Sequence, residues 1–274
     1  MNFRNEARSC VARARTELAS GDDARLKYAA LELRFAMEAL TYERAATFVE
    51  DLPPSDYEVW EPRKLMKQIL EIDSTADKDS VISFGIEENY GEPAPVMQTL
   101  GGEKVLSFAM IKKHYDALGN HLHVPTLRQQ AKGGVNHAEF RNRCETIVAF
   151  LQEVLASQIW NAIFGVYVEM VCECGHKVRR RMPPDTEETS ARCIECGLTY
   201  TVKSTGPDTV TWQLDVERIP CLGEGCSGVA GVASGHIKLG KHWICQTCGG
   251  KNEVTLGLSF KPPAINAASD LPAS

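Results

Sequence analysis

The sequence predicts an α+β fold, in which an N-terminal α-helical bundle is followed by two small β modules. Apolar residues recur at helical spacing through most of residues 1–164, whereas the sequence from Gly165 onward alternates β-branched and polar residues between turns. Eight of the ten cysteines lie in that second part, in pairs that fall within the turns. We therefore expect a helical domain over 1–164, β modules over 165–216 and 217–262, and a disordered tail over 263–274.

The helical part contains one long helix and several shorter ones. From Asp23 to about Glu50 the apolar residues recur at helical spacing, with Asp22 or Asp23 as the cap, and the run ends before Pro53. Residues 74–102 break this pattern with a strand-like run and a segment rich in Gly and Pro, which predicts a loop with a small hairpin. Further helices are predicted over 5–19, 62–72, 103–118 and 137–163.

Composition argues against several classes of protein. The net charge of −6 argues against a protein that coats nucleic acid, because phosphate binding gains its energy from clustered Lys and Arg. The most apolar uncharged stretch, Val154 to Val168, is shorter than a helix that crosses a bilayer, so no membrane span is predicted. The N-terminal residues show no apolar signal segment, and disulfide scaffolds belong to short secreted chains. We therefore expect a cytoplasmic protein with reduced cysteines.

Four pairs of cysteines have the spacing of metal ligands. Zinc prefers four soft or borderline ligands at the corners of a tetrahedron, and a short turn presents two thiolates at once. Three of the four pairs are followed directly by glycine, which adopts the left-handed conformation that such turns demand. The sequence predicts two structural Zn²⁺ ions, one held by Cys172, Cys174, Cys193 and Cys196 and the other by Cys221, Cys226, Cys245 and Cys248.

Other interpretations of the cysteines stay open at this point. The eight cysteines could instead be buried core residues or redox-active thiols. His176 lies close to Cys174, which leaves the fourth ligand of the first site open. A catalytic zinc is disfavoured, because four thiolates leave no position for water. Cys10 and Cys144 fall on predicted helices and are interpreted as small core residues.

Short strands flank the cysteine turns, for example Tyr167 to Val171 before the first and His242 to Ile244 before the last. In this arrangement, residues 165–260 resemble the zinc-ribbon families. The resemblance implies tandem, rigid ribbons over 165–216 and 217–262 that present a surface to nucleic acid or to a protein partner.

A basic strip follows the first cysteine pair. Lys177, Arg179, Arg180 and Arg181 lie within five residues in an otherwise acidic protein. Closely spaced guanidinium groups bind phosphates bidentately, so the strip is a candidate nucleic-acid contact. The alternative is an exposed strand edge that is kept soluble by its charge.

Two polar groups stand out in the helical part. Arg34 and Glu38 lie one turn apart on the long helix, and His114, His121 and His123 cluster where a later helix ends. Histidine serves as acid or base near neutral pH, so these five residues form the candidate catalytic set. The alternatives are an ordinary i, i+4 ion pair on a solvated face, and histidines that cap a helix end or hydrogen-bond within a loop.

The segments Leu31 to Glu38 and His114 to His123 resemble the HEPN-type helical domains of prokaryotic toxin and defence systems, over about residues 5–160. Active members of that family are ribonucleases that work as dimers, in which four to six residues separate an arginine from the following histidine. In this chain the nearest such pair, Arg128 and His137, is more widely spaced. The resemblance is compatible with a degenerate or binding member, and it implies a homodimer.

Two function classes follow from these features. The first is a non-catalytic zinc-binding adaptor that contacts nucleic acid or a protein partner through its ribbons, in a prokaryotic defence or toxin system. The second is a metal-independent ribonuclease in which the histidine cluster acts as acid and base and Arg34 stabilises the charge on phosphate. We favour the adaptor, because it needs only features that the sequence plainly has.

Overall fold

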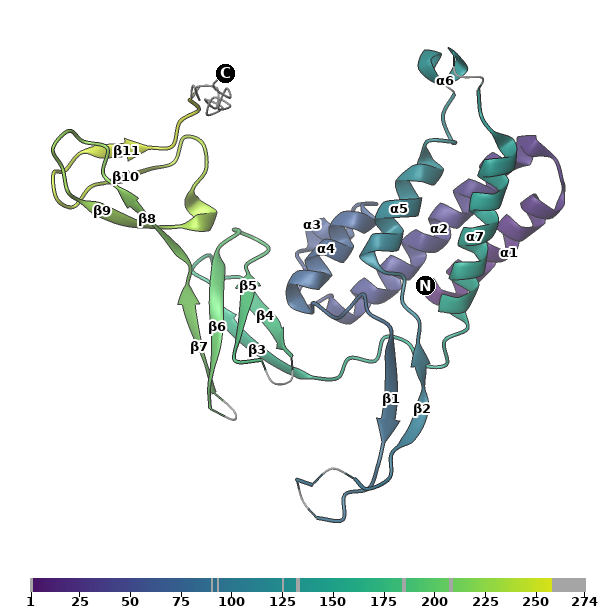
Figure 1. Cartoon of the computed structure of the whole chain (residues 1–274), viewed down its shortest axis with the longest axis horizontal. Helices are drawn as coiled ribbons and strands as arrows, with labels where there is room; N and C mark the ends of the chain where they lie inside the picture. The colour runs from purple at the N-terminus through teal and green to yellow at the C-terminus, as the bar shows by residue number, and fades with distance from the viewer. Residues whose placement is uncertain are drawn as a thin grey trace, which may run out of the picture. The chain divides into compact units, whose positions relative to one another are not determined.

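A computed structural model describes residues 2–89, 91–92, 94–124, 126–131, 134–183, 186–206 and 209–257 (Figure 1). Helices precede small antiparallel sheets, so the predicted α+β class is confirmed. The chain forms two compact units, Met1–Gln213 and Leu214–Ser274. The first unit holds the helices and the first cysteine module, and the second unit holds the second module. The three-domain division drawn from the sequence stays a prediction, and the expected tail over 263–274 lies outside the described residues.

Three of the main helices of the first unit begin at a residue whose side chain caps the helix. Asn2, Ser107 and Asn136 each accept a hydrogen bond from the backbone N–H three residues further on, as N-cap residues do. No helix in the described part of the chain is both long enough and apolar enough to span a membrane. The helical elements are α1 (Phe3–Ala19), η1 (Asp23–Arg25), α2 (Leu26–Ala45), η2 (Ala46–Phe48), α3 (Pro54–Tyr57), α4 (Pro62–Ile72), α5 (Phe108–Gly119), α6 (Leu127–Ala131) and α7 (His137–Leu155).

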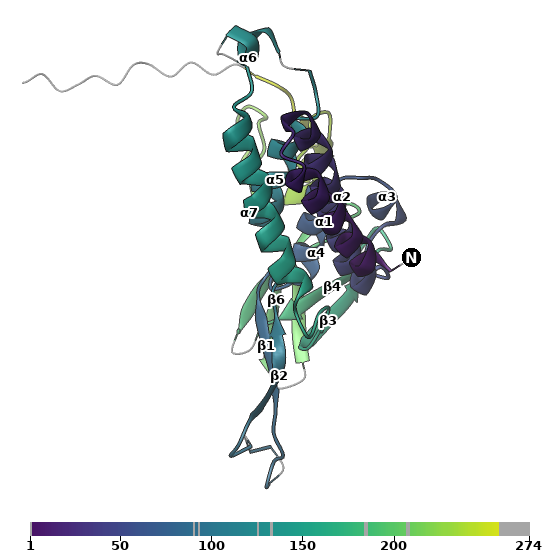
Figure 2. The same cartoon turned by 90° about the vertical axis from the view of Figure 1, so that its right-hand side faces the viewer.

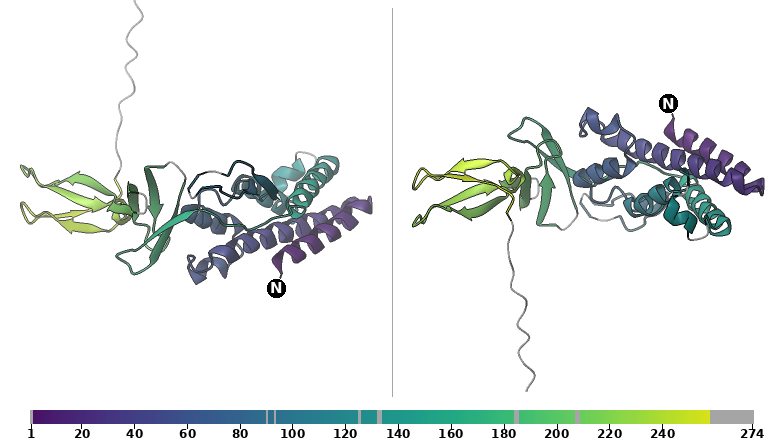
Figure 3. Two further views of the ribbon diagram at one scale, coloured as in Figure 1. Left: turned by 90° about the horizontal axis from the view of Figure 1, so that it is seen from below. Right: turned by 90° about the horizontal axis from the view of Figure 1, so that it is seen from above.

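The core of the first unit lies between α1, α2, α4, α5 and α7. Helices α1 and α2 lie side by side and antiparallel, and α7 packs against both (Figures 2 and 3). Several buried positions of these helices are alanine, including Ala7, Ala14 and Ala36, which lets their axes approach closely. Cys10 and Cys144 are buried in the same core.

A hairpin of β1 (Ser80–Phe84) and β2 (Gln98–Glu103) interrupts the helices. Because Glu103 belongs to this hairpin, the helix predicted over 103–118 begins only at Phe108. The buried Glu103 carboxylate pairs with Arg44 of α2 at 2.5 Å and accepts from the backbone N–H of Asn161 at 2.9 Å. This anchor fixes the base of the hairpin to the helical bundle.

The helix predicted over 137–163 ends at Leu155. Beyond it, the Ser157 hydroxyl accepts from the backbone N–H of Lys104 at 2.8 Å, and Asn161 adopts a left-handed conformation with φ of 55°. Left-handed backbone does not continue an α-helix, so no helix runs through Asn161 to residue 163. The chain therefore leaves the bundle here and leads into the strands.

Small sheets make up the rest of the described chain, and the four turns that follow β3, β5, β8 and β10 carry the eight cysteines of the predicted metal sites. The β3–β4, β5–β6, β8–β9 and β10–β11 pairings are antiparallel. In the first unit β3 (Val166–Val171) pairs with β4 (Lys177–Met182), and β5 (Glu188–Arg192), β6 (Thr199–Gly206) and β7 (Thr209–Leu214) form one sheet in that order. In the second unit β8 (Val216–Pro220) pairs with β9 (Val229–Ala233), η3 (Ser234–His236) follows, and β10 (His242–Ile244) pairs with β11 (Lys251–Glu253).

Candidate metal centres

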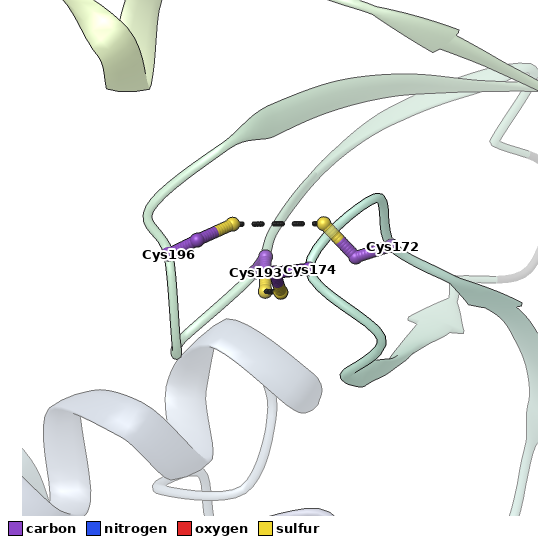
Figure 4. Close-up of side chains that lie close together, drawn as sticks. All are labelled: Cys172, Cys174, Cys193 and Cys196. Atoms are coloured by element: carbon purple, nitrogen blue, oxygen red, sulfur yellow. Dashed lines mark hydrogen bonds between the residues drawn. The ribbon is translucent and has the colours of Figure 1, made fainter.

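The first cysteine cluster lies where two turns meet (Figure 4). Cys172 and Cys174 occupy the turn after β3, and Cys193 and Cys196 occupy the turn after β5. The Sγ atoms of Cys172 and Cys196 are 3.6 Å apart, and so are those of Cys174 and Cys193. All four sulfurs lie within 4.8 Å of one another, and His176 is outside this group. The geometry therefore favours four cysteines over a histidine as the fourth ligand.

Backbone hydrogen bonds close both turns of this cluster. The N–H of Gly175 donates to the carbonyl oxygen of Cys172, and the N–H of Gly197 donates to that of Cys193, each at 2.8 Å. Gly175 has a φ of 86° and Gly197 a φ of 83°. A side chain at either position would strain the backbone, so glycine is required for the two thiols of each turn to face the same point.

The second cluster repeats this arrangement in the smaller unit. Cys221 and Cys226 follow β8, and Cys245 and Cys248 follow β10. The Sγ atoms of Cys221 and Cys248 are 3.7 Å apart, those of Cys226 and Cys245 are 3.8 Å apart, and all four lie within 4.8 Å of one another. Gly228 has no room for a side chain, since a Cβ atom there would lie 2.6 Å from the Cys245 sulfur.

These distances fit a tetrahedral metal ion and not a disulfide. Metal–sulfur bonds of about 2.3 Å give a tetrahedron with sulfur–sulfur edges of about 3.8 Å, whereas disulfide sulfurs are about 2.05 Å apart. None of the ten cysteines forms a disulfide. Four sulfur ligands fill a tetrahedral shell, so neither cluster leaves a position for water or substrate. Tetrahedral sulfur sites suit zinc or iron, and the two clusters suit two such ions.

Each cluster is contacted by a polar side chain four residues beyond its last cysteine. The buried Tyr200 hydroxyl lies 3.0 Å from the Cys172 sulfur, and the buried Asn252 amide donates to the Cys221 sulfur at 3.5 Å. Burial opposes ionisation of Cys172, but hydrogen bonds from Tyr200 and from the Cys174 N–H lower the pKa of the Cys172 thiol to about 7. The thiolate is the form that binds metal. Neither side chain was predicted as part of a site, although both stand at the same position of their modules.

Backbone N–H groups supply the second cluster with further hydrogen bonds. The N–H groups of Cys248 and Thr247 lower the pKa of the Cys245 thiol to about 6. These contacts favour the thiolate form of Cys245. At Cys226 the N–H of Gly228 also favours the thiolate, but the neighbouring thiols raise the pKa of Cys226 to about 12. At 3.4 Å, Gly223 donates to Cys221, Gly228 to Cys226 and Gly250 to Cys248.

The two sites differ in the apolar core that surrounds them. Ile194, in the turn of the first site, packs against the hydrophobic core of the helical bundle. In the second unit, as far as residue 257, the only buried apolar residues are Ala233 and Cys245. A unit with so little buried apolar surface commonly needs a metal ion to fold stably. The fold of the second unit therefore depends on its cluster more than the helical bundle depends on the first.

The basic strip lies against the helices of its own unit. Arg179 pairs with Asp51 at 3.0 Å. Arg180 donates to the carbonyl oxygens of Leu70 and Glu71, at 3.0 and 2.7 Å, where α4 ends. Unsatisfied carbonyls and the helix dipole make this end of a helix attractive to cations.

The remaining two strip residues also have partners within the chain. Arg181 pairs with the buried Asp73 at 3.3 Å, and the Tyr167 hydroxyl donates to the same carboxylate at 2.9 Å. Lys177 pairs with Glu169 on the neighbouring strand at 2.7 Å. The arginines therefore join β4 to the helical bundle, and nucleic-acid contact by the strip stays a prediction.

Arg34 and Glu38 are joined through Tyr115 of α5, and we call these three residues the Arg34 cluster. The Arg34 guanidinium lies 4.0 Å from the centre of the Tyr115 ring, and the Tyr115 hydroxyl donates to Glu38 at 2.5 Å. Gly119 makes room for the guanidinium, because a Cβ atom there would lie 2.2 Å from its Nη1 atom. The cluster lines a groove of about 620 Å³ that also includes Trp60.

The predicted histidines lie in three different environments. His114 is buried, His121 stacks on Phe140 with ring centres 3.7 Å apart, and His123 is exposed. Burial, followed by nearby positive charge, lowers the pKa of both His114 and His121, so both rings are mainly neutral at pH 7. Within the described residues, no hydrogen bond or ion pair links these histidines to the Arg34 cluster. Their catalytic role stays a prediction.

No protein-family model, curated protein or solved structure matches this chain. The HEPN-type resemblance of the helical part therefore gains no support from a relative. The two four-cysteine clusters fit tandem zinc-ribbon-like modules. The fold and the sites together define a helical protein that carries two such metal modules.

Protein purified without added metal should contain two metal ions per chain by elemental analysis, one for each cluster. Cys248→Ser should remove one ion and unfold the second unit while helical circular dichroism persists, because that unit has little apolar core. Cys196→Ser should also remove one ion but lower the stability of the helical unit, because the turn that carries Ile194 would loosen. Fewer than one ion per wild-type chain would contradict the assignment of both sites.

Tyr200→Phe should weaken metal binding at the first site by about 10-fold to 100-fold, the loss typical of an outer-shell contact. Competition with a chromophoric chelator measures the affinity. Tyr42→Phe is the matched control, because it removes a hydroxyl that donates to the Val59 carbonyl oxygen away from the cysteines. Equal metal affinity in the two variants would show that the Tyr200 contact does not stabilise the bound ion.

Proposed function

We propose that this chain is a zinc-dependent adaptor, in which structural Zn²⁺ ions hold two ribbon modules that present binding surfaces to a protein partner. The closed coordination shell carries this proposal: in each cluster four sulfurs lie within 4.8 Å of one another. Catalytic zinc sites keep an open position for water or substrate, whereas structural sites do not. Iron is the alternative for a four-sulfur site, and elemental analysis distinguishes the two.

The second ribbon supports a protein as the partner. Its exposed side chains include several large apolar residues, among them Leu222, which is 81% exposed beside Cys221. So many exposed large apolar residues in a small module favour a protein-binding role. The others are Val216, Val229, Ile237, Leu239, Ile244 and Leu256.

Contacts of the basic strip argue against nucleic acid as the main partner. The three arginines hold Asp51, Asp73 and the end of α4, so a phosphate would have to displace acceptors that the fold already uses. The chain as a whole is acidic, with a net charge of −6. An acidic protein repels nucleic acid except where basic side chains are free to concentrate on one surface.

A photo-crosslinking amino acid at Leu222 should give a discrete crosslink to another protein in cells, because this side chain is exposed on the second ribbon. The same replacement at Glu224 is the control, since Glu224 is exposed but polar. Adding Cys248→Ser should abolish the crosslink, because the ribbon would lose its metal ion. Crosslinks to nucleic acid alone, or crosslinks that survive the loss of metal, would oppose the proposal.

Replacing all three of Arg179, Arg180 and Arg181 by glutamine distinguishes a structural role of the basic strip from a role in nucleic-acid binding. We expect wild-type protein to bind labelled RNA and DNA weakly and without cleavage, and the variant to lose about 1–3 kcal/mol of unfolding free energy for each buried acceptor left unpaired. Lys203→Gln is the control, because Lys203 is exposed and pairs with the exposed Glu188 on the next strand. Tight, steeply salt-dependent binding that the triple variant loses without unfolding would instead identify a nucleic-acid site.

A further inference from the structure

The β1–β2 hairpin exposes a cluster of large apolar side chains. Each has between 47% and 84% of its surface exposed. Figure 2 shows the hairpin extending beyond the helices of its unit. Large apolar side chains exposed so close together along one hairpin are typical of an interaction site. We call the cluster the apolar arm, which comprises Val81, Phe84, Ile86, Val96, Met97 and Leu100.

The hairpin is fixed at its base and packs closely just beyond its last strand pair. At the base, Glu103 pairs with Arg44 inside the bundle. Beyond the pair of Phe84 and Gln98, Gly85 lies so close to Met97 that a Cβ atom would be 2.8 Å from the Met97 sulfur. A two-stranded hairpin alone is marginally stable in water, so these contacts keep the arm in a defined conformation. Such a surface loses little conformational entropy when it binds.

Charge around the arm has one sign. Glu87, Glu88 and Glu92 are exposed near the far end, and residues 80–103 contain no lysine, arginine or histidine. Nucleic acids and anionic membranes are repelled by such a surface. Pairing of the arm with the same arm of a second copy would bring the carboxylates of both together. The complementary surface is therefore apolar and basic.

We propose that the apolar arm docks a protein whose surface combines an apolar groove with lysine or arginine side chains. Strands β1 and β2 form a two-stranded sheet, so an extended segment of the partner can add to its edge. Phe84, Ile86 and Met97 would enter the groove while the three glutamates meet the basic side chains. The inference names a class of partner for the proposed adaptor, but it rests on the hairpin and not on the cysteine clusters.

Synthetic peptides of equal length, added to ¹⁵N-labelled full-length protein, test this proposal. An alternating Val/Lys peptide should shift the amide signals of the hairpin, and added salt should weaken its binding because screening reduces the charge attraction. A Val/Glu peptide lacks the complementary charge, and a Ser/Lys peptide lacks the apolar side chains, so neither should bind. Signal shifts of equal size with all three peptides, or confined to other regions, would overturn the proposal.

Two hairpin variants separate the apolar and charged contributions. Phe84→Ser combined with Ile86→Ser should weaken Val/Lys binding by about tenfold or more, because anchor side chains dominate the affinity of an interface. Glu87→Gln, Glu88→Gln and Glu92→Gln together should retain weak binding but lose its salt dependence. Both variants should keep wild-type circular dichroism, since every substituted side chain is exposed. Unchanged binding in the serine variant would rule out the arm as the docking surface.

Other occupants and the metal-dependent proposal are tested on the same samples. Self-association of wild-type protein that the serine variant abolishes would assign the arm to a second copy, and binding to neutral phosphatidylcholine vesicles would assign it to a membrane; either result overturns the proposal. Cys248→Ser should leave Val/Lys binding unchanged. A result against docking by the apolar arm is thus distinguishable from a result against the metal-dependent adaptor.

Discussion

Crowding of four sulfur atoms within 4.8 Å is the constraint on which both ribbon modules depend. Two thiolates 3.6 Å apart repel each other by about 5 kcal/mol at an effective dielectric constant of 20, so the ionised cluster is unstable without a cation. A metal ion replaces that repulsion with four bonds. The short strands, the glycine turns and the contacts from Tyr200 and Asn252 all serve to place thiolates around one point. In the second unit, where Ala233 and Cys245 are the only buried apolar residues up to residue 257, the metal site takes the place of a core.

The first ribbon has a second source of stability, which is its contact with the helices. Asp51 and Asp73 are buried, and a buried carboxylate is costly unless a cation pairs with it. Arg179 and Arg181 supply those cations, while Arg180 satisfies carbonyl groups at the end of α4. Removing one partner of such a pair leaves the other as an uncompensated buried charge. The arginines are thus part of the architecture of the first unit, whatever else they contact.

Local patterns predicted the helices and the cysteine clusters, but not the contacts between distant segments. Helical spacing located α2, and paired cysteines located both metal clusters, because each signal lies within a few residues. Glu103 gives no such signal: helical spacing places it in a helix, and its partner Arg44 is 59 positions away. The composition of the basic strip indicates a phosphate contact, and nothing nearby in the sequence indicates that Asp73 faces Arg181. Tyr200 could have been found, because it stands four residues after a final cysteine just as Asn252 does.

The basic strip, the second ribbon and the apolar arm differ in the charge and the apolar surface that they offer to a partner. The side chains of the basic strip are positively charged, but they pair with acceptors within the chain. The second ribbon has exposed apolar side chains, and its residues 214–257 contain four basic and four acidic side chains, so charge there gives little preference among partners. The apolar arm combines exposed apolar side chains with three glutamates that form no ion pair among the described residues. Charge contributes more to specificity and association rate than to affinity, so the arm discriminates between partners where the ribbon does not. Two surfaces of different chemistry, in separate units of one chain, are what an adaptor needs to hold two different proteins.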